Sequence, residues 1–517
     1  MAEAYETVLF GNRLEGISEE MGRLLARSAF SPNIRERLDF SCALFTARGE
    51  LLAQAAHIPV HLGSLPDLIQ IIQQQPQSPG DGWIANSPYH GGTHLPDLTM
   101  VAPIFGQPER KLLGFVAARA HHSDVGGMTP GSMPNSREVY QEGLILPPTL
   151  LMRRGRPNQD LWQILLANVR TPVEREGDLR AQWAACQLGV ARCQEYFAQV
   201  PLDLRVEQLL AHGERQMQAL LQPLGQSPPI RVEEELDWGD TTLTLRLELK
   251  MLDGFVELDF RSSCDAQPAP INATRAITCA AAYFPFFCLA QKHHGRVVVN
   301  QGSLRRIQVK TRPGSLLEAC SPYPVCAGNV ETSQRVCDLV WKALAPLFPE
   351  LVAAQSASTM NNLTLGNSAG SRPFSYYETC GGGHGGGPLG PGASGQQVAM
   401  TNTRNTPAEI LETYYPVRLW RYQLQPGSGG AGQQPGGQGV VRELELLAPA
   451  QLSLLASRRR IAPQGLMGGK EGLCAQDQLQ NPDGSQLVIS PPWSAWLESG
   501  SRFQLTTPGG GGWGQTS

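Results

Sequence analysis

The amino-acid sequence predicts an α+β protein of several domains, with β-hairpins, clustered helices and a glycine-rich, mostly β C-terminal region. Its 517 residues are 41% apolar and 17% charged, which is enough apolar material for two to four packed domains. Helical patterns gather in a few segments and do not alternate regularly with strands, so a doubly wound sheet is not expected. We expect four units, at residues 1–160, 161–230, 231–375 and 376–517.

The first unit begins with an amphipathic helix. Between residues 8 and 30, apolar side chains recur at helical spacing. From about residue 35 to 150 the pattern changes to short apolar strands, such as 38–45 and 98–104, separated by loops rich in His, Gly and Asp. We expect this region to carry the functional site. Two helical patterns, at 178–200 and 204–221, then predict an antiparallel helix pair that serves as scaffold.

The second half of the chain shows strand and turn signals. Apolar and polar positions alternate on both sides of Asp253-Gly254, which predicts a β-hairpin with a type I′ turn within residues 240–260. Another helix is expected at 331–347. Beyond residue 380, three glycine runs predict turns and close backbone approaches, with strands at 440–447 and 502–506.

Charge and hydropathy argue against several classes of function. The chain has 42 Lys and Arg against 46 Asp and Glu and no long basic block, so a nucleic-acid or anionic-membrane role has no electrostatic support. No secretory signal is expected, and the longest apolar stretch, 276–290, is too short to span a bilayer. The eleven cysteines form no C-x-x-C pair, which favours a reduced, cytoplasmic protein without a zinc knot.

Histidine clustering is the first functional signal. Six of the ten histidines fall between residues 57 and 122. His94 and Asp97 form one H-x-x-D motif, and His121 and Asp124 form a second. Neutral imidazole and carboxylate are donors for a catalytic Zn, Mn or Fe, so a mononuclear metal site is one interpretation. The alternative is that each pair is a hydrogen-bonded loop brace.

Other candidate sites have weaker support. A structural role is favoured for His57 and His61, because Pro59 between them prevents an ordinary helix. No glycine run reads G-x-x-x-x-G-K-[ST], so if ATP is used we expect another chain to bind it. No G-x-S-x-G elbow occurs. Cys326 precedes a predicted helix, which is weak evidence for an activated thiol.

A series of long motifs runs in order through the chain. They include SPNIRERLDFSCALF at 31–45, HIPVHLGSLP at 57–66, NSPYHGGTHLPDLT at 86–99, ARAHHSDVGGMTPGSMP at 118–134, EVYQEGLILPP at 138–148, CAGNVETSQRV at 326–336, MNNLTLGN at 360–367 and YYETCGGGHGGGP at 376–388. The series resembles the hydantoinase B family, which also supplies the C-terminal half of ATP-dependent 5-oxoprolinases.

The resemblance implies a metal site. It extends to the large subunits of acetone carboxylases, which hold a manganese ion through Glu, His, Asp and His. Carried over motif by motif, that set falls on Glu36, His94, Asp97 and His121. His122 is the alternative to His121, and Asp124 could orient the ligating histidine. Whether the metal is Mn, Fe or Zn stays open.

The resemblance also implies a partner. Family members usually work with, or are fused to, an actin-like nucleotide-binding subunit of the hydantoinase A type, so we expect a hetero-oligomer. That partner would bind ATP and phosphorylate a lactam or imide oxygen. Phosphorylation matters because an unstrained amide resists water, whereas an O-phosphorylated imidate has a good leaving group. The activated ring would then be opened at the site on this chain, where the metal activates water.

Further polar residues are candidates for catalysis or binding. Ser87 stands where the family usually has Asp, which removes a carboxylate near the expected site. Glu142, as a base, and Asp124 remain candidate catalytic residues. Five more residues could bind substrate or face the partner, with capping and loop bracing as the alternative: Asn329, Glu331, Arg335, Asn361 and Asn362.

Together these signals predict a cytoplasmic, metal-binding subunit of an ATP-dependent cyclic amidase. Its expected reaction opens 5-oxoproline to glutamate, or opens an N-substituted hydantoin. One alternative is an ATP-dependent carboxylase subunit of the acetone carboxylase type, which would require bicarbonate. Another is a non-catalytic scaffold for the nucleotide-binding partner. The motifs do not fix the ring that is opened or the subunit stoichiometry.

Overall fold

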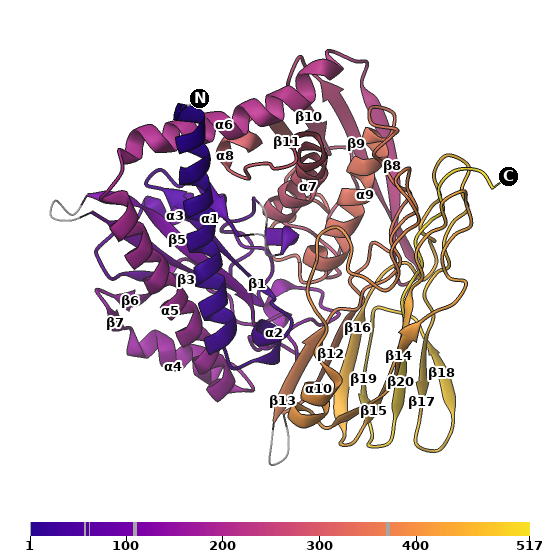
Figure 1. Cartoon of the computed structure of the whole chain (residues 1–517). Helices are drawn as coiled ribbons and strands as arrows, with labels where there is room; N and C mark the ends of the chain where they lie inside the picture. Colours follow the sequence, from indigo (N-terminus) through magenta and orange to yellow (C-terminus); the bar gives the residue numbers. More distant parts are fainter. Residues whose placement is uncertain (1, 56–57, 62, 107–110, 369–372, 517) are drawn as a thin grey trace.

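The computed structural model describes residues 2–55, 58–61, 63–106, 111–368 and 373–516. It has helices and four sheets in three neighbouring parts, which confirms the predicted α+β class (Figure 1). The N-terminal part is built on a seven-stranded sheet, the middle part on a four-stranded sheet, and the C-terminal part on two sheets. The chain passes through these parts in order, from the N-terminal to the C-terminal part.

The first sheet has the strand order β2-β1-β5-β4-β3-β6-β7. Its strands are β1 (Phe40–Thr46), β2 (Leu51–Gln54), β3 (Gly82–Ala85), β4 (Asp97–Phe105), β5 (Leu112–His121), β6 (Thr149–Arg153) and β7 (Arg156–Pro157). All its pairings are antiparallel. The central strands β1, β4 and β5 are buried almost throughout, because helices cover one face and α3 (Pro66–Gln73) packs against the other.

Helices cover the first face of this sheet. The helices are α1 (Ala2–Ser28), α2 (Pro32–Arg35), α4 (Gln159–Ala167), α5 (Pro172–Phe197) and α6 (Leu202–Leu221). The apolar stripe of α1 is fully buried at Leu14, Ile17, Met21 and Leu25, as its spacing predicts. The predicted antiparallel pair of α5 and α6 is wrong for these two described helices. Each packs mainly against other elements, α5 against α1, β4 and β5, and α6 against α1 and α8, because those surfaces complete the apolar cores.

The middle part holds a sheet of order β11-β10-β9-β8. Its elements are β8 (Ile230–Trp238), β9 (Thr241–Met251), β10 (Val256–Asp259), β11 (Ile307–Lys310), α7 (Arg275–His294), α8 (Gln301–Leu304) and α9 (Ser333–Leu344). The predicted hairpin joins β9 to β10, and Asp253 and Gly254 both have positive φ, as a type I′ turn requires. A π-helical turn, Gly328–Thr332, leads into α9, so the regular helix starts slightly later than predicted.

The C-terminal part is a pair of sheets around one core. One sheet has the order β13-β12-β16-β19 and the other β14-β15-β20-β17-β18. Its elements are β12 (Asn362–Asn367), β13 (Phe374–Glu378), α10 (Ala408–Tyr414), β14 (Val417–Leu424), β15 (Val440–Leu446), β16 (Ala450–Leu455), β17 (Asp477–Gln480), β18 (Gln486–Ile489), β19 (Trp493–Leu497) and β20 (Arg502–Thr506). Outside the C-terminal part, short 3-10 turns occur at Pro59–His61, Val139–Gln141 and Gln222–Leu224. Strands β15 and β20 confirm the two strands predicted here.

The three glycine runs lie against one another. The Gly437 N–H donates to the His384 carbonyl (2.8 Å), and the Gly510 N–H donates to the Gly437 carbonyl (2.9 Å). A Cβ added at Gly510 would lie 1.9 Å from the His384 oxygen, so only glycine allows this approach. The runs therefore make the close backbone contacts that the sequence predicts.

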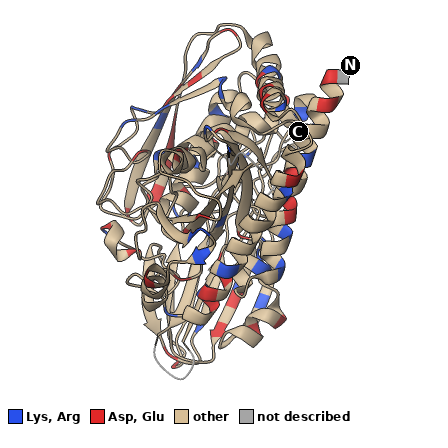
Figure 2. Cartoon of the chain, turned by 90° about the vertical axis from the view of Figure 1, so that its left-hand side faces the viewer, with Lys and Arg blue, Asp and Glu red and all other residues tan. Residues whose placement is uncertain are grey.

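No described helix is long and apolar enough to cross a membrane. Figure 2 shows the face that carries the long N-terminal helices, along which positively and negatively charged residues are interspersed.

Candidate metal centre

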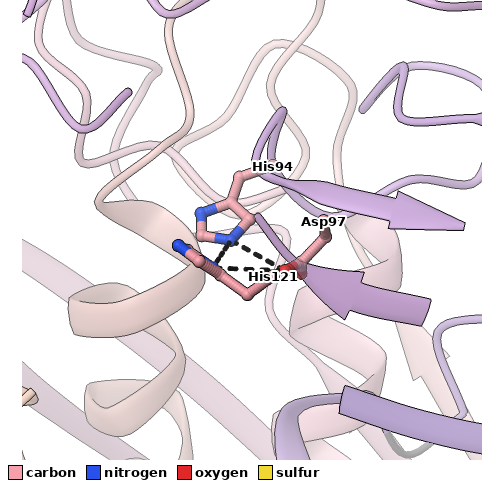
Figure 3. A group of neighbouring side chains, drawn as sticks. All are labelled: His94, Asp97 and His121. Atoms are coloured by element: carbon pink, nitrogen blue, oxygen red, sulfur yellow. Dashed lines mark hydrogen bonds and ion pairs between the residues drawn. The ribbon is translucent and has the colours of Figure 1, made fainter. Parts of the chain in front are cut away.

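Antiparallel pairing of β4 and β5 brings the histidine-rich motifs together. Asp97 is the first residue of β4 and lies opposite His121, the last residue of β5. His94 lies three residues before Asp97, in a turn closed by the Asp97 N–H, which donates to the His94 carbonyl (3.1 Å). Figure 3 shows the three side chains converging. The two H-x-x-D motifs thus supply one cluster, to which the first motif gives both residues and the second gives its histidine.

Three ligand-type atoms meet in this cluster. His94 Nε2 lies 3.2 Å from Asp97 Oδ1 and 3.2 Å from His121 Nδ1, and His121 Nδ1 lies 3.4 Å from Asp97 Oδ1. The three side chains are at most 3% exposed. Two imidazole nitrogens and a carboxylate oxygen suit Zn, Mn or Fe. Among the described residues, this is the one group of three or more His, Cys, Asp or Glu side chains arranged to hold a cation.

The backbone carbonyl of Cys326 fixes the tautomer of His94. Its oxygen lies 3.1 Å from His94 Nδ1. Because a carbonyl only accepts, Nδ1 carries the proton of the neutral ring and Nε2 keeps its lone pair toward the cluster. Burial alone would lower the pKa of His94, but Asp97 and the Cys326 carbonyl raise it overall. Burial prevails at His121 and lowers its pKa, which favours the neutral form that ligates metals.

Asp97 is held by residues on its far side. Its Oδ2 accepts from the Thr93 hydroxyl at 2.5 Å and lies 3.3 Å from His61 Nε2, while Oδ1 faces His94 and His121. His61 Nδ1 is 2.9 Å from the Ser41 hydroxyl. Burial would raise the pKa of Asp97, but the surrounding histidines hold it well below its ordinary value. One carboxylate oxygen is therefore fixed by the protein and the other is presented to the cluster.

The sequence favours a structural role for His61, and the structure brings this residue to Asp97 of the cluster. The spacing of His61 gave no signal for this contact, because it depends on how the 3-10 turn Pro59–His61 packs beside the start of β4. His57 lies outside the described residues.

Two side chains from the other parts of the molecule complete the surroundings. The ring of Tyr377, on β13, stacks on His121 with centroids 4.3 Å apart and planes at 15°. Asn329, in the π-helical turn before α9, places Nδ2 at 3.1 Å from His94 Nε2. All three parts of the fold therefore contribute to the centre. Tyr377 was missed, since nothing in its local sequence marks a residue that stacks on a distant histidine.

Glu36, which the resemblance implied as a ligand, is not part of the group. It is half-buried at the C-terminal end of α2, and the three converging ligand atoms belong to other residues. Asp39 lies three residues later and is buried, and its carboxylate acts to raise the pKa of both His94 and His121. Asp39 is therefore a second carboxylate, beside Glu36, that could supply a further ligand. Both carboxylates lie in the same short motif, and their positions in the sequence alone do not show which one is nearer the cluster.

His122 and Asp124 point away from the cluster. His122 follows β5 and faces α5, where its Nε2 lies 2.7 Å from Gln182 Oε1, and burial lowers its pKa to about 4. Asp124 pairs with Arg170, at 2.8 Å from Nη1, instead of orienting a ligating histidine. Successive residues at the end of a strand face opposite sides, which is why His121 and His122 separate.

Glu142 acts on the cluster through the backbone. Its carboxylate accepts from the N–H groups of Val325 and Cys326, both at 3.0 Å, and from the Ser136 hydroxyl at 2.8 Å. Burial raises its pKa. Because the backbone of Cys326 contacts Glu142 through its N–H and His94 through its carbonyl, these contacts hold His94 in place.

Glu331 and Asn362 are linked to the centre through the hydroxyl of Tyr377. The Tyr377 hydroxyl donates to Asn362 Oδ1 at 3.0 Å, and Asn362 Nδ2 donates to Glu331 Oε1 at 2.9 Å. Glu331 is fully buried and also accepts from the backbone N–H groups of Met360 and Ser457. In this structure both residues brace the joint between α9 and the C-terminal sheets.

Arg335 and Asn361 lie in other contacts. Arg335 is fully buried beside Asp338, at 3.5 Å. Asn361 has positive φ, and its Oδ1 accepts from Arg459 at 2.7 Å. Of the five polar residues expected to bind substrate or a partner, Asn329 is thus the one with a direct hydrogen bond to the described cluster.

Comparisons with known proteins place this geometry in a family context. A family model described as hydantoinase B/oxoprolinase matches residues 4–516. The protein 5-oxoprolinase 1 of Arabidopsis thaliana is 36% identical over 546 residues, covering 99% of this chain. This chain spans 42% of that relative's length.

Two solved structures share the fold. The ATP-dependent caprolactamase from Pseudomonas jessenii matches with a TM-score of 0.90 and 25% identity, over 99% of this chain and 91% of the other. Acetone carboxylase, in its nucleotide-free structure, matches with a TM-score of 0.88 and 17% identity, over 98% of this chain and 75% of the other. The family resemblance seen in the motifs is confirmed across nearly the whole chain.

Proposed function

The chain belongs to the hydantoinase B/oxoprolinase family, and on that premise we propose that it is the metal-binding subunit of an ATP-dependent cyclic amidase that opens 5-oxoproline. The buried cluster of His94, Asp97 and His121 is the observation that carries this proposal. The relatives named 5-oxoprolinase and ATP-dependent caprolactamase support a reaction on a cyclic amide.

The chain's own residues would prepare this site for hydrolysis. The Cys326 carbonyl keeps the His94 lone pair on Nε2, toward the cluster, and His61 and Thr93 keep one Asp97 oxygen directed at the cluster. Tyr377 covers His121 and excludes water from that side. A bound divalent metal, Mn, Fe or Zn, would supply Lewis-acid polarisation and an activated water. Asp39 is our candidate for a further carboxylate ligand.

ATP chemistry would belong to a partner. No glycine run in the sequence has the P-loop pattern. We therefore propose that an actin-like, nucleotide-binding subunit of the hydantoinase A type phosphorylates the carbonyl oxygen of the lactam. Buried Cys186, Cys326 and Cys337 are thiols outside disulfides, which supports a reducing, cytoplasmic compartment.

Hydrolysis is favoured over carboxylation because the 36% identity is to a 5-oxoprolinase, whereas the likeness to acetone carboxylase is one of fold. Incorporation of labelled bicarbonate into an acid product would instead identify a carboxylase.

The direct experiment uses the complex of this chain with its actin-like partner. ADP and glutamate release from 5-oxoproline and ATP would be measured for the intact complex, the metal-stripped complex and His94→Ala. His293→Ala, which changes an exposed histidine on α7, is the matched control. Glutamate release should fail in the stripped and His94→Ala complexes and persist in the control. Equal turnover in all four samples would reject the metal-dependent step and favour the scaffold alternative.

A further inference from the structure

Asn329 has an unusual set of contacts beside the metal cluster. Its side-chain Nδ2 donates to His94 Nε2 at 3.1 Å, and its Oδ1 is buried without a hydrogen-bond partner among the described residues. The residue is 4% exposed. A buried amide oxygen without a partner is destabilising, so such a group in a native structure calls for an explanation.

The Asn329 side-chain N–H would also lose its hydrogen-bond partner when a metal binds to the cluster. Cys326 keeps the proton of His94 on Nδ1, so Nε2 offers a single lone pair. That atom also faces Asp97 and His121, and a metal held by the three residues would take it. Asn329 would then present a free N–H and a free C=O next to the metal.

Local structure does not explain the orientation of this amide. The π-helical turn is held by other groups, since the Ser333 hydroxyl donates to the Asn329 backbone carbonyl at 2.7 Å and the Glu331 N–H donates to the Ala327 carbonyl at 2.7 Å. The Asn329 side chain is therefore not needed to close the turn. Single π-helical turns are frequent at functional sites.

We propose that the Asn329 carboxamide binds the amide edge of the substrate ring and selects rings whose nitrogen carries a hydrogen. In a small lactam ring the amide is cis, so its N–H and C=O point to the same side. A primary carboxamide pairs with this edge through two hydrogen bonds, with Oδ1 accepting the ring N–H and Nδ2 donating to the lactam carbonyl oxygen. Phosphorylation of that oxygen without loss of the N–H proton gives a protonated imidate, which keeps both contacts. This inference rests on the proposed function and makes it more specific, because it favours 5-oxoproline over N-substituted rings.

The test compares two substrates and three proteins, each in complex with the partner. The substrates are 5-oxoproline and N-methyl-5-oxoproline, and the proteins are wild type, Asn329→Leu and Asn168→Leu. The last changes an exposed asparagine at the end of α4 and is the matched control. Wild type and control should prefer the N–H ring by about 10⁴-fold in kcat/KM, because a site built to bind an N–H rejects an analogue that lacks it.

Asn329→Leu should reduce that preference to less than about tenfold, mainly by lowering kcat/KM for 5-oxoproline. Metal titration gives a second readout. Since the Asn329 N–H competes with the metal for the His94 lone pair, Asn329→Leu should bind Mn²⁺ at least as tightly as wild type. A purely structural role predicts weaker metal binding and an unchanged substrate ratio.

The outcomes separate this inference from the proposed function. If wild type opens both rings equally well, the inference fails and the cyclic amidase stands, and this result does not depend on how well any variant folds. The inference also fails if Asn329→Leu keeps the wild-type preference. If the wild-type complex opens no lactam, the proposed function fails and the inference fails with it.

Discussion

Replacing His61 with Leu should weaken metal binding without removing any of the three converging ligand atoms. His61 Nε2 is 3.3 Å from Asp97 Oδ2, and Ser41 bonds the other ring nitrogen. Since Asp97 is a carboxylate that only accepts, His61 donates from Nε2, and its Nδ1 accepts from the Ser41 hydroxyl. Loss of this donor leaves Asp97 free to rotate, so Oδ1 is presented less firmly to the metal.

The size of the effect follows from the two contacts at Asp97 Oδ2. Removing a group that orients a metal ligand typically lowers metal affinity by about 10–100-fold. The Thr93 hydroxyl remains at 2.5 Å and is the shorter contact, so His61→Leu should lie near the lower end, at about tenfold. That corresponds to about 1.4 kcal/mol of binding free energy. Thr93→Val removes the shorter contact and should have the larger effect, nearer 100-fold.

Calorimetric titration of Mn²⁺ into metal-stripped protein measures the dissociation constants of His61→Leu and Thr93→Val beside that of wild type. Thermal unfolding checks that each variant is folded. His122→Gln is the matched control, because His122 is equally buried but faces α5. Wild-type affinity in His61→Leu, or equal weakening in His122→Gln, would refute the positioning role of His61.

Three further changes test the scaffold around the centre. Gly328→Ala should destabilise the fold by about 3 kcal/mol or more, because its Cβ would lie 1.8 Å from the Asn272 carbonyl oxygen; urea unfolding measures this. Glu142→Ala should lower kcat in the complex, since the Cys326 N–H loses its acceptor and His94 its fixed carbonyl. Burial opposes ionisation of Asp237, but Arg335 and three backbone N–H groups lower its pKa, so it stabilises the fold above about pH 4. This contribution is lost as the pH falls through the lowered pKa, and Asp237→Asn should flatten the acid limb of stability against pH.

The sequence predicted the parts of the site that depend on local spacing. His94 and Asp97 are joined by a turn, and Asp97 and His121 end up opposite each other because both mark the ends of apolar strands that pair. The hairpin at Asp253-Gly254 and the glycine contacts follow in the same way from backbone conformations that few other residues adopt.

Contacts between distant segments could not be predicted from the sequence. His61 reaches Asp97, and Tyr377 reaches His121, only after the sheets have packed. Glu36 and Asp39 lie in one motif, and their order in the sequence does not show which carboxylate acts on the histidines. The prediction that α5 and α6 form a pair was wrong for a similar reason. Helical periodicity shows that one face of a helix is buried, but not which element that face packs against.

The measurement that tests the central claim most directly is glutamate release by the metal-stripped complex before and after Mn²⁺ is added back, with ATP consumption followed in the same reaction. Stripping should abolish glutamate release, and added Mn²⁺ should restore it in wild type but not in His94→Ala. Full glutamate release from the stripped complex, or restoration in His94→Ala, would contradict a metal-dependent ring opening at His94, Asp97 and His121.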